Sequence, residues 1–114
     1  MKKVFCVISH THWDREWYAS FEVFRIKLAD LIDNLLEILE REDNFRFHLD
    51  AQTSVLEDYL VIKPQNADKL KKYIAQGRVL VGPWYVQNDF YLTSGEATVR
   101  NFIIGHQIAE EFGQ

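Results

Sequence analysis

An almost unbroken apolar segment, residues 3–9, leads directly into a cluster of two histidines, an aspartate and two tryptophans, His10-Thr11-His12-Trp13-Asp14-Arg15-Glu16-Trp17. The apolar segment has the length and the β-branched content of a buried strand in a parallel sheet. The polar cluster therefore begins where a strand ends, and in α/β proteins ligands bind at that edge of the sheet. Imidazole and carboxylate groups are also the ligands of zinc sites that stay open to substrate.

Composition places the chain among ordinary globular domains, because 47% of its 114 residues are hydrophobic, 26% are charged and the net charge is -4. This mild acidity, without a Lys/Arg cluster, argues against nucleic acid as a partner. No stretch approaches the ~20 apolar residues of a membrane helix. The single cysteine, Cys6, is expected to be a small buried side chain in a reducing compartment. We therefore expect a cytoplasmic protein without a nucleic-acid or membrane partner.

Periodicity along the chain predicts strands that alternate with helices. Apolar residues at helical spacing indicate an amphipathic helix over residues 21–40, and residues 45–50 alternate as a strand does. Two short helices on either side of Pro64, a strand at residues 79–81 and a helix that ends at Gly113 complete the pattern. This order is typical of βαβ units around a parallel sheet, so residues 1–114 are expected to form one α/β unit.

Two pairs of residues have the spacing of a capping box, in which a serine or threonine precedes a glutamate by three positions. Ser54 with Glu57 predicts the start of the helix before Pro64, and Thr93 with Glu96 predicts the start of the last helix.

Polar side chains follow each of the three predicted strands. In strand order they are His10, His12 and Asp14, then Asp50 and Gln52, then Asn88 and Asp89. Right-handed βαβ units bring all three strand ends to one edge of the sheet, so these groups are expected to meet there, as in the active site of a barrel.

A metal site is the interpretation that this convergence favours. In an extended segment His10, His12 and Asp14 project to one side of the backbone, because side chains alternate. One of the histidines can serve to orient the others by a hydrogen bond rather than bind the metal. The alternative for a His-x-Asp spacing is a surface turn, but the position after a buried strand, facing the carboxylate of Asp89, favours the metal site.

Three segments of the chain carry a resemblance to a known family. They are His12-Trp13-Asp14-Arg15-Glu16-Trp17, Phe47-His48-Leu49-Asp50, and Gly82-Pro83-Trp84-Tyr85-Val86-Gln87-Asn88-Asp89 with Ser94-Gly95-Glu96. In order and spacing these segments resemble the bacterial α-mannosidases of glycoside hydrolase family 38, over essentially all 114 residues. The resemblance implies a zinc-dependent retaining α-mannosidase with a seven-stranded α/β barrel, of which this chain would be the amino-terminal portion.

The resemblance also implies roles for single residues. The His-x-Asp pair that binds zinc in the family corresponds to His12 and Asp14, which leaves His10 a supporting role. The aspartate that serves as zinc ligand and nucleophile corresponds to Asp89, and the tryptophan that stacks on the sugar corresponds to Trp17. The implied substrate is an α-mannoside oligosaccharide or glycan.

General chemistry agrees with these roles. A retaining glycosidase needs one carboxylate that attacks the anomeric carbon and a second group that protonates the leaving oxygen. A metal ion can hold the cis O2 and O3 hydroxyls of mannose, and an indole is a platform for a sugar ring. For Trp17 the alternative is packing in the core. Structural roles are expected for a further set of residues, namely His48, Asp50, Trp84, Tyr85 and His106.

The chain is much shorter than the enzymes it resembles. It should lack a further histidine ligand, the acid/base carboxylate and the later barrel strands, so we expect a fragment that is inactive alone. An uncovered sheet edge would favour self-association into a homo-oligomer. Two alternatives are a metal-dependent amidohydrolase or deacetylase, which the His10-x-His12 spacing also suits, and a non-catalytic carbohydrate-binding or structural domain.

Overall fold

The centre of the fold is a parallel sheet of three short strands, described in a computed structural model that covers residues 2–114. The strands β1 (Ser9–His10), β2 (Phe47–His48) and β3 (Val79–Leu80) lie in the order β1-β2-β3. In register, Ser9 pairs with Phe47 and Phe47 pairs with Val79. The expected α/β organisation with a parallel sheet is therefore confirmed for this part of the chain.

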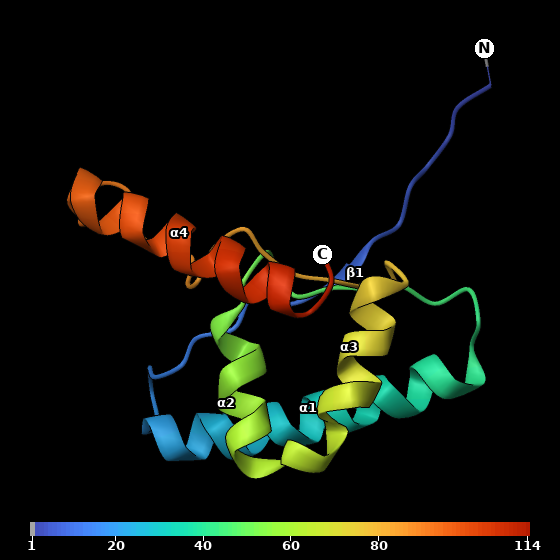
Figure 1. Cartoon of the computed structure of the whole chain (residues 1–114). Coiled ribbons are helices and arrows are strands. Elements are labelled where there is room, and N and C mark those ends of the chain that lie inside the picture. The colour runs from blue at the N-terminus through green and yellow to red at the C-terminus, as the bar shows by residue number, and fades with distance from the viewer. Residues whose placement is uncertain (1) are drawn as a thin grey trace.

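Helices cover the sheet from two sides. Between β1 and β2 lies α1 (Phe21–Arg41), and between β2 and β3 lie α2 (Ser54–Ile62), the 3-10 helix η1 (Pro64–Asn66) and α3 (Ala67–Ala75). After β3 comes α4 (Gly95–Glu111). Figure 1 shows α1, α2 and α3 on one side of the sheet and α4 on the other. Among the described residues no helix is long and apolar enough to span a membrane.

The core forms where α1 meets α2, α3 and the sheet. Helix α1 begins and ends within one residue of the predicted bounds, and the apolar stripe that predicted it is its buried face. Leu28 and Ile32 of this stripe are fully buried, as are Leu56 of α2 and Leu70 of α3. Burying one such side chain contributes roughly 1.5–3 kcal/mol, so this stripe fixes α1 against its neighbours.

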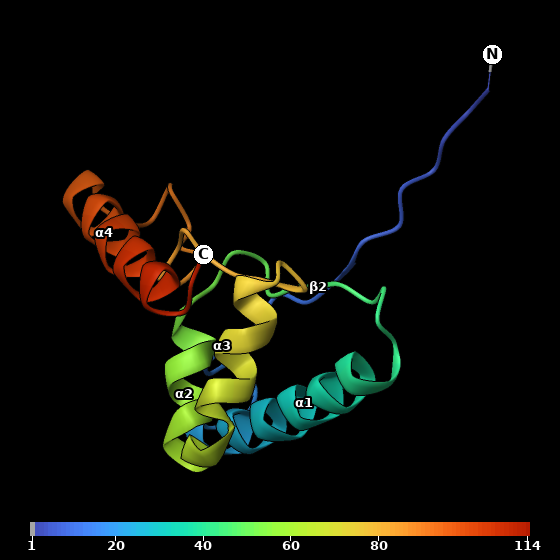
Figure 2. The same ribbon diagram turned by 45° about the vertical axis from the view of Figure 1, so that its right-hand side comes forward.

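The first strand is much shorter than predicted. Only Ser9 and His10 pair with β2, while residues 3–8 extend away from the body of the molecule, as Figures 1 and 2 show. Val4 is 83% exposed and Val7 is 93% exposed. Cys6, predicted to be buried, is exposed as well. Strand β1 lies at the edge of the sheet, so β2 is its one neighbour among the described strands. Strand β2 pairs with only two of its residues, Ser9 and His10.

Both predicted capping boxes are also misplaced by one residue. Helix α2 is preceded by Thr53, and the hydroxyl of Ser54 is buried without a hydrogen-bond partner in the structure. Helix α4 is capped by Ser94, whose Oγ accepts a hydrogen bond from the backbone N–H of Ala97 at 3.2 Å. The spacing therefore predicts each helix start to within one residue but assigns the cap to a neighbouring residue.

Tyr59 connects α2 to α1 through a partly buried hydrogen bond. Its ring is fully buried, and its hydroxyl donates to Oδ1 of Asp33 at 2.6 Å. Lys63 lies 3.1 Å from the other oxygen of the same carboxylate. Burial, reinforced by the hydrogen bond to Asp33, raises the pKa of Tyr59 to about 12. The neutral phenol is therefore the form that the fold stabilises.

This raised pKa predicts a loss of stability in alkali. The contribution of Tyr59 is fully present below its ordinary pKa of 10.0 and is lost as the pH rises toward about 12. Tyr59→Phe should cost about 1 kcal/mol at neutral pH. The free energy of unfolding of this variant should also fall less steeply than that of the parent as the pH rises from 10.0 to about 12. Urea unfolding at several pH values measures both, and an equal slope for the two proteins would refute the role given to Tyr59.

Helix α4 lies directly on the backbone of the loop that follows β3. A Cβ atom on Gly105 would lie 2.1 Å from the carbonyl oxygen of Pro83 and 2.6 Å from the nitrogen of Tyr85. No side chain fits at such distances, so a glycine at this position lets α4 approach the loop.

Gly105→Ala should therefore push α4 away from the loop and lower the free energy of unfolding by at least about 2 kcal/mol. Gly95→Ala is the matched control, because a Cβ on Gly95 meets no atom within 4 Å. That control should be neutral or slightly stabilising, since alanine favours helix. Urea unfolding of both variants tests the packing, and equal stabilities would contradict it.

Candidate active site

The loops after the three strands meet at one edge of the sheet, as the βαβ order predicted. The backbone N–H of Thr11, after β1, donates to the carbonyl of His48 at 3.1 Å. After β2 and β3, Trp84 donates to the carbonyl of Ala51 at 3.0 Å, and Thr53 donates to the carbonyl of Trp84 at 2.9 Å. The first bond extends the pairing of β1 with β2, and the other two extend the pairing of β2 with β3, so the loops lie side by side.

His12 and Asp14 form a close pair in this loop region. His12 Nε2 lies 3.3 Å from Asp14 Oδ1, with side chains that are 46% and 37% exposed. They line a hollow of about 220 Å³ together with Arg15, Gln52 and Gln87, among other residues. The pair is therefore accessible to a ligand from solvent.

Gln52 fixes the backbone between these two residues. Its side-chain amide accepts from the N–H of Trp13 at 2.8 Å and donates to the carbonyl of Trp13 at 2.9 Å. Gln52 is 2% exposed, so these bonds are shielded from water. The sequence placed Gln52 at this edge, but nothing in its spacing indicated this clamp.

His10 faces Asp50 and not the pair. Its Nδ1 lies 2.7 Å from Asp50 Oδ1, and the same oxygen lies 3.4 Å from Nδ1 of His48. Asp50 takes part in the hydrogen bonding expected of it, whereas the supporting role of His10 toward the metal ligands stays a prediction. His48, whose role was expected to be structural, joins the same polar cluster.

Asp89 is placed apart from His12 and Asp14. Its Oδ1 accepts from the backbone N–H of Tyr91 at 2.9 Å, within its own turn. Among residues 2–114 the structure contains no group of three His, Cys, Asp or Glu side chains arranged to hold a metal ion. The structure thus brings together two of the three predicted ligands, and the role of Asp89 stays a prediction.

The aromatic residues divide into exposed and packed ones. Trp17 is 75% exposed, so within residues 2–114 its indole does not pack in the core. Trp84 packs against the rings of Phe102 and Phe90, with centroid distances of 4.0 Å and 5.3 Å. The packing role expected for Trp84 is therefore confirmed, whereas a sugar-stacking role for Trp17 stays a prediction.

An ion pair that the sequence did not reveal anchors the loop of residues 11–20 to α2. Arg15 donates from Nε and Nη2 to the two oxygens of Asp58, at 2.7 Å and 2.8 Å. Asp58 is 6% exposed, and its hydrogen bond raises the pKa of Arg15. A carboxylate within the buried face of an apolar helix was the available signal, because such a charge needs a partner.

Breaking this pair should destabilise the protein. Arg15→Met leaves the buried carboxylate of Asp58 unpaired, and we expect a loss of about 2 kcal/mol, because the Arg15 side chain is itself 36% exposed. The matched control is Arg100→Met, which removes an exposed pair with Glu96 and should cost at most about 0.5 kcal/mol. Denaturant unfolding compares the two, and equal losses would contradict the anchoring role.

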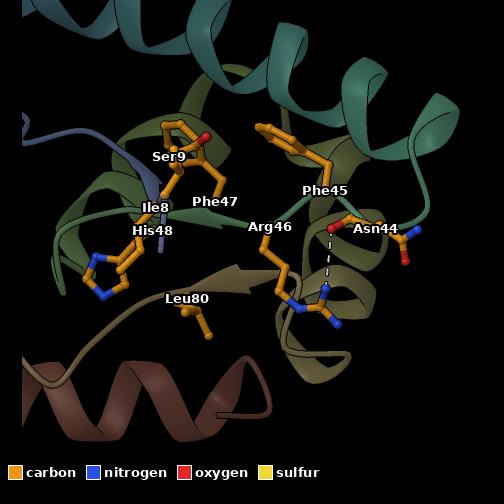
Figure 3. A pocket seen from close by; sticks show the side chains of 9 residues that line it. Ile8, Ser9, Asn44, Phe45, Arg46, Phe47, His48 and Leu80 are labelled. Atoms are coloured by element: carbon orange, nitrogen blue, oxygen red, sulfur yellow. Dashed lines mark hydrogen bonds between the residues drawn. The ribbon is translucent and has the colours of Figure 1, made fainter. Parts of the chain in front are cut away.

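A second pocket, of about 410 Å³, is lined by residues of all three strands and of the segments that precede β1 and β2. Figure 3 shows the side chains of Phe45, Phe47 and Leu80 around it, and the guanidinium of Arg46 donating to the carbonyl of Asn44. Its lining includes neither His12 nor Asp14, so it is separate from the hollow described above.

Comparison with known proteins gives this site its context. Residues 2–114 match the Glycosyl hydrolases family 38 N-terminal domain. The chain belongs to this family. Its fold agrees with a crystal structure of an alpha-mannosidase from Enterococcus faecalis V583, with a TM-score of 0.90 and 42% identity over 94% of the chain. A second family 38 structure from Enterococcus faecalis gives a TM-score of 0.84 and 38% identity over 93% of the chain.

Two curated relatives agree with this membership. The chain is 52% identical, over its whole length, to a protein of Halalkalibacterium halodurans named "Putative mannosylglycerate hydrolase". It is 28% identical, over 94% of its length, to alpha-mannosidase G of Dictyostelium discoideum. The chain spans 13% and 10% of these two relatives, and 12% of each matched structure.

Proposed function

We propose that this family 38 chain contributes part of the active site of a zinc-dependent retaining α-mannosidase. The observation that carries the proposal is the 3.3 Å separation of His12 Nε2 and Asp14 Oδ1. With metal–ligand bonds of about 2.1 Å at tetrahedral angles, two ligands of one zinc ion lie roughly 3.4 Å apart. The donor types, their spacing and their exposure thus fit two ligands of a zinc ion.

Further residues would complete the chemistry. The exposed indole of Trp17 is available as a platform for a mannose ring. Asp89 is exposed, and its carboxylate would attack the anomeric carbon as nucleophile and serve as a further ligand. A bound zinc ion would hold two neighbouring hydroxyls of the sugar. Asp89 would have to leave its hydrogen bond with Tyr91 to join the site.

We propose that residues 1–114 form the amino-terminal portion of a seven-stranded α/β barrel. The parallel order of the three strands supports this, since a barrel of this type is built from parallel strands. The remaining ligand and the acid/base group would come from other strands, so the 114-residue chain alone would be inactive. Its cytoplasmic location, and self-association through the uncovered edge, stay predictions.

Mannosylglycerate is a second candidate substrate, because the relative with 52% identity carries that activity in its name. Both candidates share a mannosyl group, which the zinc ligands and Trp17 would recognise. They differ in the leaving group. Hydrolysis of mannosylglycerate and of an α-mannosyl oligosaccharide by a longer protein that contains this chain would separate the two, and a chelator should abolish either reaction.

Zinc binding by the chain itself can be measured by calorimetry. We expect one zinc ion per chain, with an affinity that falls at least about tenfold in His12→Ala, because that variant removes one of the two ligands. His106→Ala is the matched control, since His106 lies exposed on α4, and it should bind as the parent does. Absence of zinc binding to the parent chain, or equal binding by His12→Ala, would contradict the proposed ligands.

A further inference from the structure

We propose that Gln87 is a positioning residue that sets the tautomer of His12 and so aims the Nε2 lone pair at Asp14. The proposal rests on the proposed function of His12 and Asp14 as metal ligands. Gln87 Oε1 lies 2.6 Å from His12 Nδ1, the ring nitrogen that faces away from Asp14. Gln87 comes from the loop after β3, and no role for it follows from the sequence.

The orientation of the Gln87 amide is fixed by its second contact. Its Nε2 donates to the backbone carbonyl of Asp50 at 2.7 Å. A carbonyl oxygen accepts and cannot donate, so the NH₂ group of Gln87 must face Asp50. Its oxygen must then face His12. Because an amide oxygen only accepts, Nδ1 of His12 must carry the hydrogen.

A hydrogen on Nδ1 of His12 decides what the other ring nitrogen, Nε2, can do. In a neutral imidazole whose Nδ1 carries the hydrogen, Nε2 holds a lone pair. This lone pair lies 3.3 Å from an oxygen of the Asp14 carboxylate, so two acceptors face each other with no hydrogen between them. A cation between Nε2 and the carboxylate oxygen would relieve the repulsion of these two acceptors. The opposite tautomer would instead donate from Nε2 to Asp14, and both ligands would be engaged with each other.

Gln87 is itself held in place by α4. The side-chain amide of Asn101 accepts from the N–H of Val86 at 2.9 Å and donates to the carbonyl of Val86 at 2.7 Å. On the other side, the left-handed backbone of Asp50, with φ of 42°, belongs to the turn that presents its carbonyl to Gln87. Gln87 thus links α4 and the turn after β2 to a ligand that follows β1.

The tautomer can be read directly in the metal-free chain. Long-range ¹H–¹⁵N correlation spectra at about pH 8, where imidazole is neutral, distinguish the two ring nitrogens. We expect hydrogen on Nδ1 of His12 in the parent chain, and a shift toward the Nε2–H form in Gln87→Leu. Gln87→Glu retains an acceptor and should keep the parent tautomer. Gln107→Leu, on the exposed surface of α4, is the matched control and should also keep it.

Zinc affinity gives a second readout. Gln87→Leu should bind zinc roughly 10- to 100-fold more weakly, as expected for the loss of a group that orients a ligand. Its urea unfolding midpoint should stay near that of Gln107→Leu. A parent chain that binds no zinc would refute the proposed metal site, while the spectra would still decide the role of Gln87. An Nε2–H form in the parent, or an unchanged tautomer in Gln87→Leu, would overturn the positioning role.

Discussion

The parallel register of three short strands is the constraint on which the site depends. Because Ser9, Phe47 and Val79 lie in one row, the chain leaves all three strands at the same edge of the sheet. Backbone hydrogen bonds then continue between the loops after β2 and β3, where Trp84 donates to Ala51. Side chains separated by 75 positions in the sequence, such as His12 and Gln87, reach hydrogen-bonding distance as a result.

Close packing on both sides of the sheet keeps this register. On one side, the buried stripe of α1 and the buried hydroxyl of Tyr59 join three helices into a core. On the other, the absence of a side chain at Gly105 lets α4 reach the loop backbone, so that Asn101 can hold Val86. The polar residues of the loops therefore sit on a packed base, although they are themselves partly exposed.

The sequence predicted the helices and strands better than the side-chain contacts between them. The apolar spacing of α1 and the polar groups after each strand were sufficient to predict the helix and the shared edge. The predicted strand was too long at Val4 and Val7, because β2 pairs with Ser9 and His10 and a run of apolar residues does not show where pairing stops. The partners of Gln52, Gln87 and Asp58 could not be predicted, because these contacts span about 40 or more positions, although the buried carboxylate of Asp58 indicated that it needs a partner.

The central claim is that His12 and Asp14 are joint ligands of one metal ion. The most direct measurement is anomalous X-ray diffraction at the zinc edge from crystals of the chain grown with zinc. Our account predicts a peak within about 2.2 Å of both His12 Nε2 and Asp14 Oδ1. A zinc ion bound instead between His10 and His48, or on Nδ1 of His12 in place of Gln87, would contradict it.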